Sequence, residues 1–279
     1  MSLTSSQTQA YLRRIGLDRA PAATLEGLAD VQAAHMQRVP FENLDVFLRR
    51  PLSTDVVALH RKIVEQHRGG YCFELNTQYG RLLQALGFKA QRVMARVWLR
   101  DPAKTPTRNH LAWLVYLDGR RYLTDVGFGG MTSRIPVDIN AEEPSKDADG
   151  PIRVIPDEHF GYMLERGTAT GEWHKQYSFD LSSVADQDVE CANHWMQTHP
   201  KSHFREARFV GLFTKEGRNG LFDQNFTCRV GKKRREEEIV YVSDLAEIQG
   251  QSPWLDTLRD QFGIELSLTS DERLRLLSV

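Results

Sequence analysis

The first 67 residues have the apolar spacing of helices rather than strands. Pro21 and Pro40 interrupt this spacing, and Pro40 biases the residue before it away from helical backbone, so a helix is expected to end there. A further helix is expected to start after Ser53 or Asp55 and to run toward Gln66. The apolar positions, at the three- and four-residue steps of one helical face, are Tyr11, Leu12, Ile15 and Leu17, then Leu25, Leu28, Val31, His35 and Met36.

From residue 89 the pattern changes to that of strands. Three segments are rich in Val, Trp, Tyr and Leu, which favour strands. They are residues 91–99, 110–117 and 121–126. Residues 101–109 contain two prolines and are expected to form a loop. Asp118-Gly119 separates the last two strands, and this pair predicts a two-residue hairpin turn because both central residues need a positive φ.

The predicted hairpin has a consequence for two polar residues. If residue 117 pairs with residue 120, Ala112 faces Asp125, and His110 lies two residues along on the same face. Diagonal neighbours of this kind have β-carbons roughly 7 Å apart, so a carboxylate reaches an imidazole. A three-residue loop would instead place His110 and Asp125 on opposite faces. The sequence therefore predicts a His–Asp contact that depends on the length of the turn.

Shorter elements are expected beyond residue 130. Residues 139–151 have the composition of a surface excursion. Residues 217–220 are expected to break a run of strands at their glycines, and 232–238 to form a solvated hairpin end because their opposite charges are adjacent. The expected elements are strands near 152–155, 162–165 and 173–179, a helix over 186–198, strands within 204–243, helices over 242–248 and 253–262, a strand over 264–268 and a tail helix from 271.

Cys72 follows two glycines and lies at the start of a segment with helical spacing. Gly69 and Gly70 precede Cys72 closely, and apolar residues then recur at helical steps until Gly87, which stands where a C-terminal cap would. A position at a helix N-terminus favours the thiolate, the form that attacks a carbonyl. The alternative is a buried cysteine that packs as a small hydrophobe. Cys191 and Cys228 lack this setting and are interpreted as packing residues.

Composition narrows the class of protein. The chain has 279 residues, is 41% hydrophobic and 26% charged, and carries a formal net charge of −1. This balance gives no electrostatic attraction toward nucleic acid or an anionic membrane. No basic N-terminal region with an apolar stretch precedes the helices, so we expect a cytoplasmic protein. Three scattered cysteines without a Cys-x-x-Cys pair argue against a disulfide framework and against a metal site.

Cys72, His110 and Asp125 together provide the groups of a nucleophilic triad. A thiolate attacks, an imidazolium keeps it ionised and later supplies a proton, and a carboxylate fixes the orientation of the ring. Other interpretations stay open at this point. The chain has eight other histidines, His110 could be a core residue, and Asp125 could cap a turn.

Three motifs resemble those of the arylamine N-acetyltransferase family. They are Val-Pro-Phe-Glu-Asn-Leu-Asp at 39–45, Arg-Gly-Gly-Tyr-Cys-Phe-Glu-Leu-Asn at 68–76 and Tyr-Leu-Thr-Asp-Val-Gly-Phe-Gly at 122–129. The resemblance covers almost the whole chain and implies an α+β fold with the core of papain-like and transglutaminase-like cysteine enzymes. It implies an N-terminal helical bundle over 1–88, a β-barrel-like domain over 89–200 and a C-terminal α/β lid over 201–279.

The resemblance also implies a reaction and the residues that perform it. Acetyl-CoA would be the donor, and an arylamine, hydrazine or N-hydroxyarylamine the acceptor. Cys72 would accept the acetyl group, His110 would be the general acid and base, and Asp125 its orienting partner. The turn that contacts the cofactor matches Phe128 and Gly129. The positions that line the acceptor pocket match Phe41, Val97, Phe128 and Phe204.

One position departs from the family pattern, which has Thr before the catalytic histidine where this chain has Asn109. This difference puts cofactor contacts there in doubt. Glu42 and Arg68 could form an ion pair close to the thiol or a surface pair. The oligomeric state is expected to be a monomer or a homodimer.

Three other functions are compatible with the same residues. The first is an amide synthase on this scaffold, which would take an acyl group from a carrier protein. The second is a cysteine hydrolase, in which water replaces the amine. The third is a xenobiotic-binding protein with an inert thiol, which labelling of the cysteines with iodoacetamide would distinguish from an enzyme.

Overall fold

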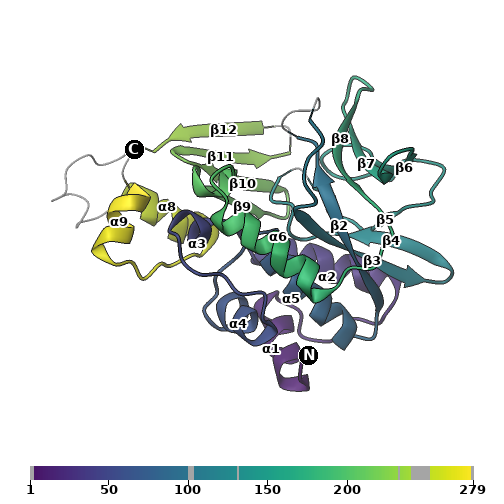
Figure 1. Ribbon diagram of the computed structural model, residues 1–279, viewed down its shortest axis with the longest axis horizontal. Coiled ribbons are helices and arrows are strands. Elements are labelled where there is room, and N and C mark those ends of the chain that lie inside the picture. Colours follow the sequence, from purple (N-terminus) through teal and green to yellow (C-terminus); the bar gives the residue numbers. More distant parts are fainter. Residues whose placement is uncertain (1–2, 100–103, 131, 232, 240–251, 278–279) are drawn as a thin grey trace.

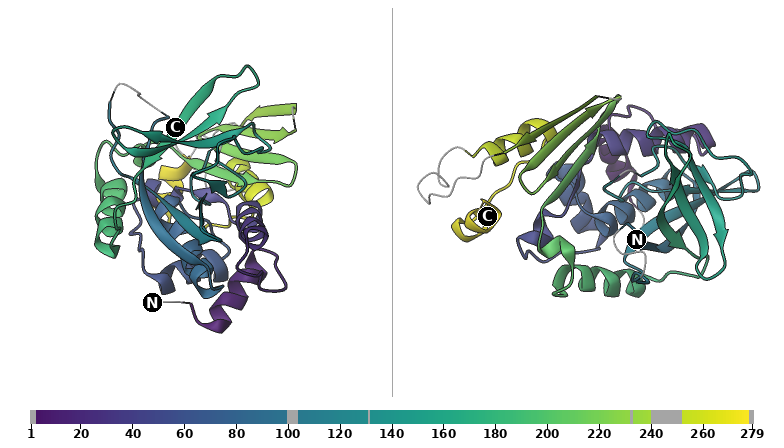
Figure 2. Two further views of the ribbon diagram at one scale, coloured as in Figure 1. Left: turned by 90° about the vertical axis from the view of Figure 1, so that its right-hand side faces the viewer. Right: turned by 90° about the horizontal axis from the view of Figure 1, so that it is seen from above.

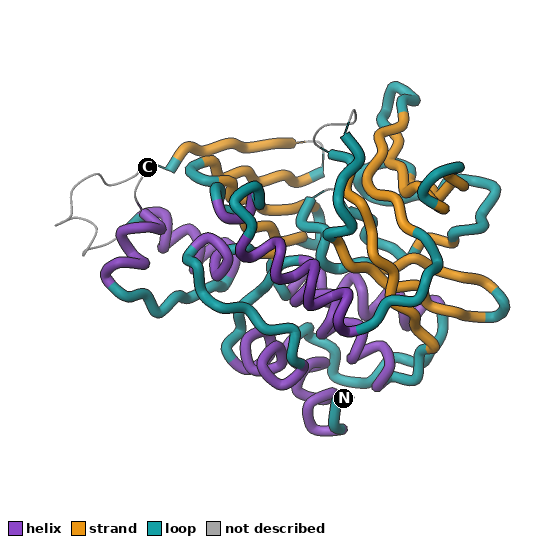
Figure 3. The backbone as a smooth tube through the Cα atoms, in the orientation of Figure 1, coloured by secondary structure: helices purple, strands orange, loops and turns teal. Residues whose placement is uncertain are grey.

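The computed structural model describes residues 3–99, 104–130, 132–231, 233–239 and 252–277. Helices gather on one side of the molecule and strands on the other (Figure 3). Figure 1 places the helices of the first 88 residues beneath two sheets, one from the middle of the chain and one from its last third. The predicted α+β class, with a barrel-like sheet, is confirmed. The division into three segments at residues 88 and 200 stays a prediction.

Three of the N-terminal helices begin at a polar residue whose side chain caps the helix, namely Thr4, Thr24 and Asp55. Thr4 and Gln7 form a reciprocal capping box, and the Asp55 side chain accepts hydrogen bonds from two backbone N–H groups of its helix. Gly87, with φ of +88°, follows the fifth helix as predicted. The helices are α1 (Ser5–Arg14), α2 (Leu25–Arg38), α3 (Leu44–Phe47), α4 (Val56–His60), which continues into the π-helical turn η1 (Arg61–Glu65), and α5 (Cys72–Ala85).

The first sheet has seven antiparallel strands in the order β5-β4-β3-β2-β8-β7-β6. Its outer strands β5 and β6 lie near each other, so the sheet almost closes on itself. Figure 2 shows its strong curvature. The strands are β2 (Lys89–Val97), β3 (His110–Leu117), β4 (Arg120–Thr124), β5 (Val137–Asp138), β6 (Ile152–Asp157), β7 (Gly161–Gly167) and β8 (Trp173–Phe179).

The hairpin between β3 and β4 has the predicted register. Leu117 pairs with Arg120, and Asp118 and Gly119 have φ of +49° and +76°, as a two-residue turn with both residues left-handed requires. Strand β4 ends at Thr124, one residue before Asp125. The short turn thereby fixes which side chains share the face of the sheet that meets α5.

The second sheet joins the last third of the chain to its beginning. Its order is β1-β9-β10-β11-β12, and Phe41 in β1 pairs with Gly211 in β9. Helices α8, α9 and α3 pack on one face of this sheet, and Figure 2 shows α8 and α9 beside it. The elements are β1 (Phe41–Glu42), α6 (Asp186–Thr198), η2 (His203–Arg205), β9 (Phe209–Phe213), β10 (Gly217–Phe222), β11 (Asn225–Val230), β12 (Lys233–Glu238), α8 (Pro253–Phe262) and α9 (Ser270–Leu277).

Three predictions for this region are wrong, and a fourth lies outside the described residues. Residues 217–220 are not a break but part of β10, where a β-carbon on Gly217 would lie 1.7 Å from the Arg229 carbonyl oxygen. The glycine therefore permits close strand approach rather than a turn. Residues 233–238 are solvent-exposed, as predicted, but they form the edge strand β12 instead of interrupting the strands, and 264–268 contain no strand. The helix predicted over 242–248 cannot be compared.

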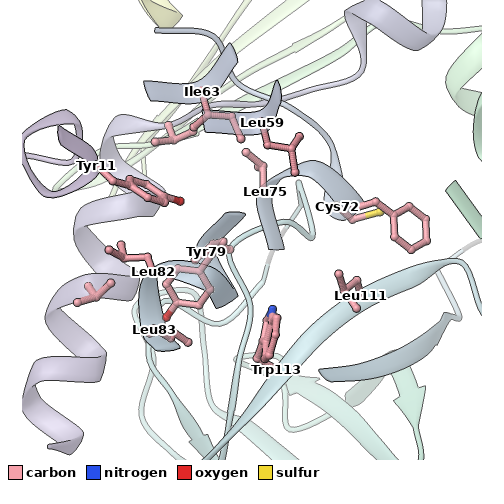
Figure 4. Packing of buried hydrophobic residues seen from close by; sticks show 14 of the residues in the cluster. Tyr11, Leu59, Ile63, Cys72, Leu75, Tyr79, Leu82, Leu83, Leu111 and Trp113 are labelled. Carbon is pink, nitrogen blue, oxygen red and sulfur yellow. The ribbon is translucent and has the colours of Figure 1, made fainter. Parts of the chain in front are cut away.

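The largest core cluster lies where α5 meets the other N-terminal helices and β3. Figure 4 shows Tyr79, Leu82 and Leu83 of α5 packed toward Tyr11 of α1, with Trp113 of β3 below them. All five side chains are at most 1% exposed. Cys72 lies at the end of this cluster, so the first turn of α5 is held by the core behind it.

Candidate active site

Cys72 is the first residue of α5. The Glu74 side chain reaches back to accept a hydrogen bond from the Tyr71 N–H at 3.1 Å, which satisfies one of the free donors at this helix start. Cys72 is only 4% exposed. Its Sγ lies 3.7 Å from the backbone carbonyl oxygen of Asn109, the residue before His110. The structure thus places the thiol against the first residues of β3.

The predicted contact between His110 and Asp125 is present. Their Nε2 and Oδ2 atoms are 2.7 Å apart, and both residues are 2% exposed. Burial alone raises the pKa of Asp125, but the His110 ring and hydrogen bonds from Asn76 and the Gly127 N–H outweigh it and lower the pKa below its usual value. Because Asp125 is ionised, it accepts this hydrogen bond and Nε2 is the donor.

Sequence reasoning missed Asn76, which ties three elements together at this site. Its Nδ2 donates to Asp125 Oδ1 at 2.9 Å and to the Leu111 carbonyl at 2.6 Å, and its Oδ1 accepts from the Val126 N–H at 3.2 Å. Asn76 follows Cys72 by four residues, so both lie on one face of α5. That spacing was the available signal.

Gly127 was also missed as a site residue. A β-carbon at this position would lie 2.9 Å from Cys72 Cα and 2.6 Å from Asn76 Nδ2. Its N–H donates to Asp125 Oδ1 at 2.8 Å. The absence of a side chain lets the loop after β4 close against the start of α5.

The protonation state of the thiol differs from the expectation for a helix N-terminus. Burial raises the pKa of Cys72 well above its usual range, the charge of Asp125 adds to the rise, and the backbone N–H of Phe73 opposes it only in part. The thiol is therefore the resting form when His110 is neutral.

Aromatic rings surround the imidazole and the helix start. The ring centroids of Phe128 and Tyr177 lie 5.3 and 5.1 Å from that of His110. Val97 packs in the same apolar cluster as these two residues. Phe204 lies 6.0 Å from Phe41 and packs in the same cluster as Cys72. The residues predicted to line an acceptor pocket therefore belong to two apolar groups, one on the first sheet and one beside α5.

Asn109 presents its backbone to the thiol and its side chain elsewhere. Its Nδ2 lies 3.6 Å from the sulfur of Met196 in α6, and its Oδ1 is buried without a hydrogen-bond partner in the described part of the chain. The contact with Cys72 is made by the backbone carbonyl of Asn109. It therefore does not depend on whether this position holds Asn or the family's Thr.

The Glu42–Arg68 pair is buried, which excludes the surface alternative. Arg68 Nη2 lies 2.6 Å from Glu42 Oε1 and 3.2 Å from Asp45 Oδ1. Lys62 bridges Asp45 and Glu74, each at 2.7 Å. Burial, opposed by Lys62, raises the pKa of Glu74 to about 7. This cluster joins β1 and the segment before α5 to the residue that caps Cys72's helix.

A buried thiol against the start of the strand that carries His110, whose ring Asp125 holds, is consistent with the arrangement of cysteine-dependent transferases and hydrolases. Comparison with known proteins is more specific. A family model described as N-acetyltransferase matches residues 24–271. An arylamine N-acetyltransferase of Mycolicibacterium smegmatis is 35% identical over 261 residues, which cover 92% of this chain and 91% of the relative. The chain belongs to the arylamine N-acetyltransferase family, as the motifs predict.

Solved structures agree in fold over nearly the full length. An arylamine N-acetyltransferase from Salmonella typhimurium superposes with a TM-score of 0.88 at 29% identity, covering 99% of each chain. The Mycobacterium marinum enzyme in complex with CoA gives a TM-score of 0.83 at 30% identity, covering 97% of each. None of the helices in the described ranges is long and apolar enough to cross a membrane. Those same ranges contain no group of three acidic, His or Cys side chains arranged to hold a metal ion.

Proposed function

We propose that this chain transfers the acetyl group of acetyl-CoA to arylamines, hydrazines or N-hydroxyarylamines through a thioester on Cys72. The observation that carries the proposal is the placement of Cys72 at the start of α5 against β3, where His110 is held by Asp125 at 2.7 Å. Family membership supports the reaction class. The relative with bound CoA supports the donor.

The first half-reaction begins with a proton transfer within the site. His110, whose Nε2 donates to Asp125, takes the thiol proton on Nδ1. The Cys72 sulfur attacks the thioester carbonyl, and the negative oxygen of the tetrahedral intermediate accepts hydrogen bonds from backbone donors. The Cys72 N–H is one candidate because the first N–H groups of a helix have no partner within it.

Collapse of the intermediate breaks the bond between the carbonyl carbon and the sulfur of CoA. The imidazolium returns its proton to that sulfur, so CoA leaves as a thiol and an acetyl group remains on Cys72. In the second half-reaction the acceptor nitrogen attacks the new thioester and His110 removes its proton. Cys72 then leaves as the thiolate, and the cycle closes when the proton returns to it.

Apolar side chains near the site suit flat acceptors. We assign Phe41, Val97, Phe128 and Phe204 to the acceptor pocket, since aromatic rings gain from edge contacts with such walls. Phe128 and Gly129 are assigned to the contact with the donor. The C-terminal segment is assigned the role of a lid that limits hydrolysis of the thioester. A cytoplasmic location and a monomeric or homodimeric state stay predictions.

A product assay tests the proposal. Purified protein with acetyl-CoA and an arylamine is expected to yield the N-acetylated amine, measured by chromatography. Cys72→Ser is expected to abolish formation of this product, whereas Cys191→Ser, at an exposed cysteine, is the matched control and is expected to retain it. Equal rates for the two variants, or CoA release that gives only acetate in the presence of amine, would contradict the proposal.

A further inference from the structure

Strand β12 is the outermost strand of the second sheet (Figure 1). It pairs with β11 on one side, and no strand of the described residues pairs with its other side. All six of its residues are exposed. The free edge of a strand presents unpaired N–H and C=O groups, with which a strand of another chain can pair. The edge of β12 therefore has the geometry to accept a strand from a second molecule.

The backbone groups at this free edge belong to alternate residues. The Ile239 N–H donates to the Gln224 carbonyl at 2.8 Å, so the backbone of residue 239 faces β11. The direction of hydrogen bonding alternates along a strand, so the other odd-numbered residues of β12 face β11 as well. The N–H and C=O groups of Arg234, Glu236 and Glu238 consequently point to the free edge.

The side chains of β12 change sign halfway along the strand. Its first three residues are basic and its last three are acidic. Two ion pairs, Arg234–Glu236 and Arg235–Glu237, run along the strand, and all four side chains are more than half exposed. Ion pairs as exposed as these contribute little to stability. Their charges therefore remain available to a partner across the edge.

This order of charges is complementary to itself in the antiparallel orientation. Two copies of one strand that pair in this way are related by a two-fold axis perpendicular to the sheet, so each residue lies opposite one on the same face. With the axis at Arg235, Lys233 lies opposite Glu237 of the second copy, and Arg234 lies opposite Glu236. Both pairs form twice. The backbones of Arg234 and Glu236 are also the ones that point to the free edge, so this pair can exchange N–H···O bonds.

Charges on an edge strand commonly prevent association, and their order distinguishes the two roles. An edge that carries one sign of charge repels a second copy, because like charges directly opposite each other are destabilising. In β12 only Arg235, at the axis, meets its own copy, and it keeps Glu237 of its own chain beside it. Parallel pairing in register would instead set every charge opposite its like. The pattern thus favours one partner in one orientation.

We propose that β12 is a dimerisation strand, along which two copies of this chain pair antiparallel and join their five-stranded sheets into one. The charge pattern carries the choice of a second copy as the partner, since β12 itself is the strand that complements it. Six residues from each chain make a small interface, so the dimer is weak and reversible. The proposal is independent of the proposed acetyl transfer.

Sedimentation velocity over a series of protein concentrations tests the proposal. The unmodified protein is expected to shift from monomer to dimer with a dissociation constant on the order of 10 μM. Raising the salt concentration from about 0.05 to 0.5 M is expected to weaken the dimer several-fold, because exposed charge pairs are screened. Monomer at every concentration would overturn the proposal.

A charge swap tests the interface itself. Arg234→Glu sets two glutamates opposite each other in both copies, and Glu236→Arg does the same with two arginines, so each variant alone is expected to associate about tenfold more weakly. An equal mixture of the two variants restores opposite charges and is expected to dimerise like the unmodified protein. Arg19→Glu, at an exposed arginine between α1 and α2, is the matched control and is expected to leave association unchanged. Unchanged association of both variants, or no recovery in their mixture, would contradict this pairing.

A second pair of variants tests the backbone contact. Glu236→Pro removes an N–H group that points to the free edge, at an edge position that tolerates proline. Glu236→Gln removes the same charge and keeps the N–H. The proline variant is expected to stay monomeric, whereas the glutamine variant is expected to dimerise only several-fold more weakly than the unmodified protein. Thermal unfolding checks that both variants are folded. Equal association of the two folded variants would show that the strands do not pair and would overturn the proposal.

Discussion

Replacement of Asp125 by Asn changes one hydrogen bond at the site and keeps the others. In the protein, Asp125 Oδ1 accepts from Asn76 Nδ2 and the Gly127 N–H, whereas Oδ2 accepts from His110 Nε2. An Asn side chain has the same shape, and its oxygen can take the place of Oδ1. Its NH₂ group then faces His110 Nε2 and must donate, so the imidazole proton moves to Nδ1.

With its proton on Nδ1, the His110 ring has no lone pair on that atom and cannot accept the thiol proton there. Since burial already raises the pKa of Cys72, the variant has no other route to the thiolate. We expect acetyl transfer to fall about 10³- to 10⁴-fold, the scale found when a triad carboxylate becomes an amide. That loss corresponds to about 4–5.5 kcal/mol in the barrier. Unfolding free energy is expected to change by only about 1–2 kcal/mol.

The assay is single-turnover formation of the acetyl-enzyme, with denaturant unfolding measured in parallel. Asp138→Asn is the matched control. Like Asp125, Asp138 is buried and paired with a basic side chain, here that of Arg120, but it lies on β5 away from the site. This control is expected to acetylate at a near-normal rate. An Asp125→Asn rate within tenfold of the unmodified protein would refute the role of the carboxylate in orienting His110.

Three further predictions concern the surroundings of the site. Arg68→Met removes the guanidinium 2.6 Å from the buried Glu42 and leaves Lys62, at 3.9 Å, as its remaining charged partner; we expect a loss of about 3 kcal/mol in denaturant unfolding, and a loss below about 1 kcal/mol would contradict a buried pair. Burial lowers the pKa of His35 to about 3, so its neutral form stabilises the fold above the unfolded pKa and this contribution is lost as pH falls. We expect His35 to lower the free energy of unfolding by about 2 kcal/mol at pH 5 relative to pH 8. If the His35→Gln variant loses as much stability between these two pH values as the unmodified protein, the prediction is wrong. Gly127→Ala pushes the loop away from Cys72; we expect acetylation to slow while thermal unfolding shows a folded protein, and unchanged acetylation would exclude this close approach.

The parts of the site that follow from local rules could be predicted. Asp118-Gly119 fixes the turn length, turn length fixes which residues share a face, and so the His110–Asp125 contact follows from sequence alone. The start of α5 at Cys72 follows from the apolar steps and the preceding glycines. Each of these inferences needs only residues close together in the chain.

The rest depends on how distant segments meet. Asn76 acquires its role only when α5 docks on β3, so helical periodicity cannot single it out from other polar positions. Strand β1 has two residues, too few to show a period, and pairs with β9 far along the chain. The raised pKa of Cys72 likewise follows from burial by the whole core, which outweighs the helix terminus that sequence reasoning relied on.

Mass spectrometry of the protein after mixing with acetyl-CoA alone tests the central claim most directly. Without an acceptor amine the second half-reaction cannot proceed, so the thioester should accumulate. We predict one added acetyl group, on the peptide that contains Cys72, and none on the peptides of Cys191 or Cys228. Unmodified Cys72 in a preparation that nonetheless acetylates arylamines would contradict the account, because the acetyl group would then pass to the amine without the thiol.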